Sequence, residues 1–173
     1  VITLASAADF SAKGTDVALR SIARARGLGD YRIVLIERGR DVSNAVDLAG
    51  RLGLLSRMWL IKPVPNDLMS GLYGISDIVI AAISKNEVLS MTALESMACG
   101  TPTLNTFNPS YYGKELRPVL RYGASDLTAL IEELGSDPHL RAAVGRKQLE
   151  WVTKYHSSKN VASIVRNMYY EIS

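Results

Sequence analysis

Short apolar runs alternate with amphipathic segments along this chain of 173 residues. The apolar runs have the length and composition of buried strands. They lie at 1–5, 31–36, 58–61, 77–83, 102–104 and 118–122. Apolar residues recur at helical spacing in the other segments, which lie at 15–25, 41–52, 65–73, 90–99, 126–134, 140–156 and 158–172. Strands that alternate with helices predict an α/β protein with a doubly wound parallel sheet.

The whole chain is expected to form one domain. Its length suits a single full core, and no repeat or low-complexity linker divides it. It begins without Met, directly in a strand-like run, which predicts the C-terminal part of a longer protein. The one long irregular stretch is 105–117, and loops of this length are more often functional than not.

One glutamate follows the fourth predicted strand. Glu87 comes just after the run at 77–83, so it is expected in the loop at the carboxyl end of a parallel strand. In open α/β sheets, ligands bind at that edge. Ser90 is expected to cap the next helix and Gly100 to close it.

A second glutamate, Glu95, lies one turn into that helix. Met91, Leu94 and Ala98 share one face of this helix at helical spacing, and we expect that face to be apolar and buried. Glu95 then lies roughly 70° from the centre of this face, at its border. A carboxylate there costs free energy unless it is paired or binds something. From the two glutamates alone, the preferred interpretation is a solvated loop residue and a carboxylate paired with a nearby Lys or Arg.

Lys13 and Gly14 end the loop after the first strand, just before a helix that Thr15 or Asp16 is expected to cap. A lysine at this edge can neutralise a phosphate, and glycine permits close approach of the backbone. Taken alone, Lys13 is more simply interpreted as a solvated loop residue.

Charge and composition exclude several classes of protein. The net charge of +3 and pI of about 9.0 permit anionic ligands such as diphosphates, and no basic block indicates nucleic-acid binding. The single Cys excludes an internal disulfide framework and fits a reducing compartment. One Cys and two distant His cannot form a zinc site of the usual spacing. No apolar run approaches transmembrane length. The glycine-rich signatures of nicotinamide enzymes and P-loop NTPases are absent from the sequence.

The order of these parts resembles the C-terminal, donor-binding domain of retaining glycosyltransferases of family 4. The E-x7-E signature of that family appears as Glu87 and Glu95, and the family's L-E-A-M-A-C-G-x-P resembles residues 94–102. Its K-G after the first strand matches Lys13 and Gly14. Weaker matches lie at 48–60, 68–83 and 137–141, and the final helix resembles one that, in this family, crosses back toward the N-terminal domain.

The resemblance implies a Rossmann-like domain, one half of a GT-B glycosyltransferase, covering residues 1–173. It would bind a nucleotide-diphosphate sugar for retaining transfer to an acceptor. Glu95 would accept hydrogen bonds from the donor ribose, Glu87 would lie beside the transferred sugar, and Lys13 would stabilise the leaving diphosphate. The remaining donor contacts would come from Gly14, from the backbone N–H groups of Val88, Leu89 and Ser90, and from Val64 near the base.

The resemblance also implies the partners. The donor substrate is a nucleotide sugar, and neither a metal nor another cofactor is expected. The acceptor would bind to a missing N-terminal domain, so the chain alone is expected to be inactive. The implied location is the cytoplasm, with peripheral association of the full-length protein with the cytoplasmic face of a membrane left open.

The chain departs from the family at one position that matters for charge. The family usually has an Arg five or six residues before the lysine, where this chain has Ala8 and Ala7. An Arg at either position is expected to strengthen donor binding, and Arg38 or Arg40 is a candidate substitute. Two alternatives stay open: a non-catalytic glycosyltransferase-like interaction or regulatory module, and a GT-B nucleotide-sugar epimerase.

Overall fold

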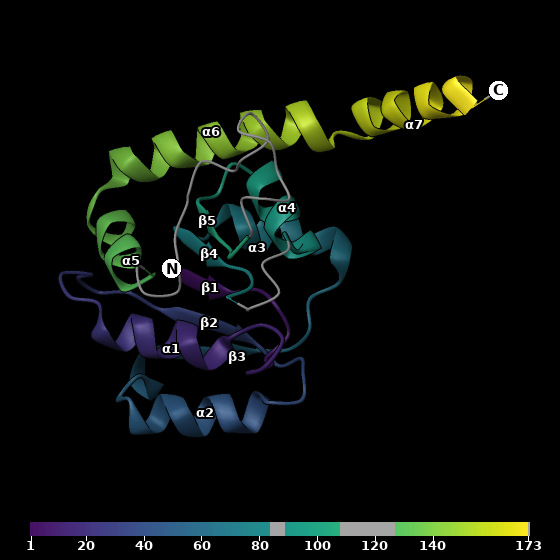
Figure 1. The fold of residues 1–173 in the computed structure, drawn as a ribbon. Coiled ribbons are helices and arrows are strands. Elements are labelled where there is room, and N and C mark those ends of the chain that lie inside the picture. The colour runs from purple at the N-terminus through teal and green to yellow at the C-terminus, as the bar shows by residue number, and fades with distance from the viewer. Residues whose placement is uncertain (84–88, 108–126, 173) are drawn as a thin grey trace.

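The computed structural model describes residues 1–83, 89–107 and 127–172, and Figure 1 shows how its elements are arranged. Five parallel strands form one sheet in the order β3-β2-β1-β4-β5. The strands are β1 (Ile2–Leu4), β2 (Ile33–Ile36), β3 (Met58–Ile61), β4 (Ile78–Ile80) and β5 (Thr103–Leu104). The α/β doubly wound prediction is therefore confirmed. The strand predicted at 118–122, and most of the long loop, lie outside the described residues.

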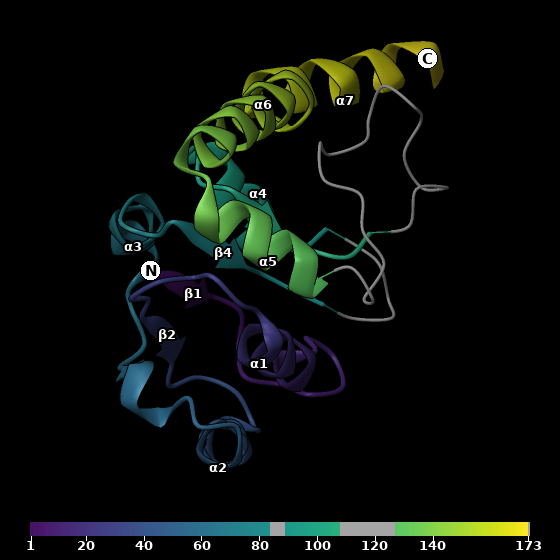
Figure 2. The same ribbon diagram turned by 90° about the vertical axis from the view of Figure 1, so that its left-hand side faces the viewer.

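Helices cover both faces of the sheet (Figure 2). One face packs against α1 (Thr15–Arg24), α2 (Val42–Arg51) and α5 (Leu127–Ser136). The strand residues Leu4, Leu35 and Ile80 point into this larger core, because alternate strand residues face the same side.

The opposite face carries α3 (Met69–Gly74), α4 (Met91–Ala98) and α6 (Pro138–His156). Two smaller cores lie here, one around Tyr73 of α3 and one where α4 meets Trp151 of α6. Two 3-10 turns precede β3 and α3, at Leu55–Arg57 and Asn66–Leu68. The last helix, α7 (Ser158–Ile172), extends away from the rest of the domain in Figure 1. Within the described residues, no helix combines the length and apolarity that crossing a membrane requires.

The buried face of α4 differs from the prediction. Ala93, Ser96 and Met97 are buried, whereas Met91 is 68% exposed and Ala98 is also exposed. The reason is the packing of α4 against α6, where Ala93 and Met97 join one apolar cluster with Trp151. The expectation that Met91, Leu94 and Ala98 form the apolar contact face was wrong for Met91 and Ala98.

The helix ends are mostly as predicted. Ser90 is the N-cap of α4, and its Oγ accepts a hydrogen bond from the backbone N–H of Ala93 at 3.1 Å. The N-cap of α1 is Gly14, not Thr15 or Asp16, and it makes no side-chain cap bond. Thr15 Oγ1 instead accepts a hydrogen bond from the backbone N–H of Asp9 at 3.0 Å, so this side chain fixes the loop before the helix.

Candidate functional site

The strand order places a switch point between β1 and β4. After β1 the chain passes to α1 on one face of the sheet, and after β4 it passes to α4 on the opposite face. The two connections diverge at the carboxyl ends of these neighbouring strands, which is where open α/β sheets bind ligands.

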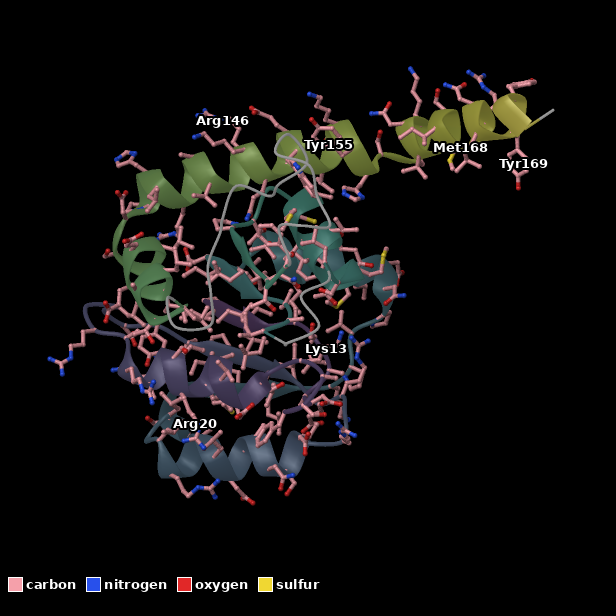
Figure 3. All side chains as sticks on the ribbon, in the orientation of Figure 1. Lys13, Arg20, Arg146, Tyr155, Met168 and Tyr169 are labelled. Carbon is pink, nitrogen blue, oxygen red and sulfur yellow. The ribbon has the colours of Figure 1, made fainter. Side chains whose placement is uncertain are left out.

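Lys13 and Gly14 are tied to the end of β4. The backbone N–H of Ile83 donates a hydrogen bond to the Lys13 carbonyl oxygen at 2.8 Å. Gly14 has a φ of 63°, and a Cβ at this position would overlap the carbonyl oxygen of Ile83. Only glycine fits this approach without displacing backbone. Figure 3 shows the half-buried Lys13 at the carboxyl edge of the sheet. The loop therefore presents an ammonium group at the switch point, beside the N-terminus of α1.

A cavity of about 10 Å³ lies under this loop. It is lined by Leu4, Ser6, Lys13, Thr15, Ala18, Ile80 and Ala81. The buried Ser6 hydroxyl has no hydrogen-bond partner among the described residues. The volume suits one water molecule rather than a substrate. Sequence reasoning did not single out Ser6, because a serine at a strand end carries no signal of its own.

Two carboxylates hold the rest of the β1–α1 loop. The pKa of Asp9 is lowered, mainly because its carboxylate accepts a hydrogen bond from the backbone N–H of Ala12. A hydrogen bond from Arg40 contributes less. The Asp41 carboxylate accepts from the backbone N–H of Phe10 at 2.9 Å, and this bond is the main reason that its pKa is lowered. Arg40 Nε lies 3.0 Å from Asp9 Oδ2 and 3.8 Å from Asp41 Oδ2. The Arg40 charge is therefore already paired with the carboxylates of Asp9 and Asp41.

Ala7 and Ala8 are not equivalent. Ala8 is fully buried in the larger core, its N–H donates to the Arg38 carbonyl at 2.6 Å, and its carbonyl accepts from Asp41 N–H at 3.0 Å. Ala7 is only half-buried. The structure therefore restricts the expected benefit of an added arginine to position 7.

Glu95 lies on the exposed side of α4 and is held by a tyrosine. The Tyr73 hydroxyl donates a hydrogen bond to Glu95 Oε2 at 3.1 Å. No ion pair involves Glu95 within the described residues, so the simpler interpretation, pairing with Lys or Arg, is not what this part of the chain shows. An open pocket of about 290 Å³ adjoins the pair. It is lined by Asn66, Met69, Ser70, Tyr73, Glu95, Ala98 and Cys99.

The other predicted site residues lie around the same edge. Ser90 starts α4, and its hydroxyl donates to Asn105 Oδ1 at 3.0 Å. Leu89 is half-buried against the α4–α6 core, and Val64 packs beside the Tyr73 cluster just beyond β3. Glu87 and Val88 lie outside the described residues.

The described residues contain no group of three or more His, Cys, Asp or Glu side chains that could hold a metal ion. Sequence reasoning missed Tyr73 as a site residue. Its only signal was the Leu72-Tyr73 pair that matches the family, to which no role was assigned.

Known proteins match this chain over most of its length. The sequence profile described as "Glycosyl transferases group 1" matches residues 1–114. A D-inositol 3-phosphate glycosyltransferase from Mycolicibacterium gilvum is 36% identical over 97 residues, which cover 53% of this chain and 21% of that protein. The chain thus spans only about a fifth of the length of such relatives.

Two solved structures share the fold at low sequence identity. The C-terminal domain of a glycosyl transferase group 1 family protein from Francisella tularensis aligns with a TM-score of 0.73 and 19% identity, over 91% of this chain and 86% of that one. The Anabaena protein HepE, in complex with UDP and glucose, aligns with a TM-score of 0.75 and 14% identity, over 98% of this chain and 47% of that one. The fold is thus that of GT-B glycosyltransferases, and the profile match over residues 1–114 shows that the chain belongs to the group 1 family of glycosyl transferases.

Proposed function

We propose that residues 1–173 form the donor half of a family 4 retaining glycosyltransferase that binds a nucleotide-diphosphate sugar. The observation that carries the proposal is the attachment of Lys13 and Gly14 to the end of β4 at the switch point. Glu87 and Glu95 are proposed as the E-x7-E pair of this site. Family membership and fold support the assignment.

The proposed chemistry follows from where charge develops. As the bond between the anomeric carbon and the diphosphate breaks, negative charge grows on the diphosphate oxygens. An ammonium group and the positive end of a helix stabilise such charge, and Lys13 lies beside the N-terminus of α1. We assign Glu95 to the donor ribose and Glu87 to the transferred sugar. The backbone N–H groups of Val88, Leu89 and Ser90 are proposed to donate to the donor phosphate and sugar. Val64 is proposed to contact the base.

We propose a uridine nucleotide as the first donor to test, because HepE was solved with UDP and glucose. Relatives named for D-inositol 3-phosphate suggest a phosphorylated polyol as the first acceptor to test. No metal or additional cofactor is included in the proposal. The cytoplasm, or the cytoplasmic face of a membrane, is the proposed location.

The acceptor-binding half is proposed to be an N-terminal domain that lies outside this chain. The exposed face of α7 supports this proposal. Val161, Ile164, Val165 and Met168 are 43–58% exposed and recur at helical spacing on a helix that projects from the domain (Figure 3). An apolar stripe of this kind is typical of a helix that packs against another domain.

One observation favours a non-catalytic module instead. The family's second cation is missing, and Arg40, a candidate substitute for it, is paired with the Asp9 and Asp41 carboxylates. If the chain binds no nucleotide diphosphate, this alternative replaces the enzymatic proposal.

The two glutamates should separate by assay. Glu95→Ala is expected to weaken binding of UDP by about 1–3 kcal/mol, because charge-assisted hydrogen bonds to the ribose are lost. Glu87→Ala should barely change UDP binding but should cripple sugar transfer by the full-length protein. Calorimetric titration and a transfer assay measure the two effects, and equal losses of UDP affinity for both variants would undo the assignment.

A further inference from the structure

Tyr73 places a buried hydroxyl against an exposed carboxylate. Its side chain is 2% exposed, packed among Ala5, Ile36, Met69 and Val79, yet its hydroxyl reaches Glu95 Oε2 at 3.1 Å. A tyrosine ring fixed in a core has little freedom, so its hydroxyl is held at one point in space.

The backbone around Tyr73 is fixed as well. The Thr101 hydroxyl donates to the Tyr73 carbonyl oxygen at 2.8 Å, just after the end of α4. Tyr73 thus contacts α4 through its side chain, and it contacts the segment that follows α4 in the chain through its backbone. The end of α3 and the exposed side of α4 are held in one arrangement.

The Tyr73 hydroxyl keeps its proton at neutral pH, so it can donate to Glu95. Burial, and then the negative charge of Glu95, raises the pKa of Tyr73 above its usual value. One oxygen of Glu95 therefore faces a protonated hydroxyl at neutral pH. The other oxygen stays available, because Glu95 is exposed and borders the open pocket between α3 and α4.

An unsupported glutamate on a helix surface samples many rotamers, and ordering it opposes ligand binding. A rigid partner removes part of that cost before the ligand arrives. We propose that Tyr73 is a positioning residue that fixes the Glu95 carboxylate for hydrogen bonding to the ribose hydroxyls of the donor. This inference rests on the proposed function, since it assumes that Glu95 binds the ribose.

The test compares UDP with 2′,3′-dideoxy-UDP by calorimetry on the chain as it exists. Tyr73→Phe keeps the ring and removes only the hydroxyl. It should weaken UDP binding about fivefold to tenfold and leave binding of the dideoxy analogue nearly unchanged. In a Glu95→Ala background the same change should have no further effect on UDP. Tyr155→Phe, on α6, is the matched control and should alter neither affinity.

Three results would overturn the inference and leave the proposed function intact. A purely structural hydroxyl would weaken both nucleotides equally while lowering the melting temperature, and independent roles would give additive losses in the double variant. UDP affinity unchanged in Tyr73→Phe would also contradict it. If the parent chain binds none of UDP, GDP and ADP, the proposed function itself fails and this inference fails with it.

Discussion

Gly14→Ala is expected to destabilise the domain by about 3 kcal/mol or more. The left-handed conformation costs an L-residue about 1–2 kcal/mol, and here the new methyl group would also overlap the Ile83 carbonyl oxygen. Relief of that overlap requires the loop to move away from β4, which breaks the hydrogen bond from Ile83 N–H to the Lys13 carbonyl. Urea unfolding followed by circular dichroism measures the loss.

Gly27 supplies the matched control. It has a similar φ of 72°, but a Cβ there would meet nothing within 4 Å. Gly27→Ala should therefore cost only the conformational strain, about 1–2 kcal/mol. Equal losses for the two variants would show that the contact between Gly14 and Ile83 is not a constraint in solution. A partly folded Gly14→Ala protein should also have lost affinity for UDP, because Lys13 would be displaced.

The second large effect concerns the arginine that the family usually has in this loop. Ala8→Arg is expected to lower the free energy of unfolding by more than about 4 kcal/mol, because Ala8 is fully buried and an unpaired guanidinium in the core is costly. Ala7→Arg should leave a folded protein, since Ala7 is half-buried. If the loop can aim the new side chain at the diphosphate, Ala7→Arg should strengthen UDP binding by about 1–2 kcal/mol.

Ala12→Arg is the control for these two variants. It adds the same charge to an exposed position in the same loop, so its stability should match that of the parent chain. Thermal denaturation separates the three variants, and UDP titration then compares those that fold. An Ala8→Arg protein as stable as Ala12→Arg would contradict the burial that the structure assigns to position 8.

The strands and caps were predictable because their signals are local. The apolar runs located every strand within the described residues, and Ser90 was identified as a cap by its residue type and its place before a helical segment. The sequence also predicted a close backbone approach at Gly14, but it did not show which group approaches. Its partner Ile83 lies just beyond the end of β4, and the sequence does not show that this segment meets the loop after β1.

The parts that could not be predicted depend on contacts between distant segments. The buried face of α4 is set by Trp151, far along the chain, and not by the helix's own apolar spacing. Neighbouring alanines at 7 and 8 look alike in sequence, yet only one of them lies in the core. Tyr73 and Glu95 are 22 positions apart on different helices, so their hydrogen bond appears only once α3 and α4 are placed side by side.

In the proposed site, the donor diphosphate binds at the switch point, with Lys13 as its cation. The most direct measurement is the UDP affinity of three proteins at two salt concentrations: the parent chain, Lys13→Ala and Lys147→Ala. Lys147 is an exposed lysine on α6. Lys13→Ala should nearly abolish UDP binding, Lys147→Ala should leave it unchanged, and higher salt should weaken binding by the parent chain. Unaltered UDP affinity in Lys13→Ala would contradict this site and would favour the non-catalytic alternative.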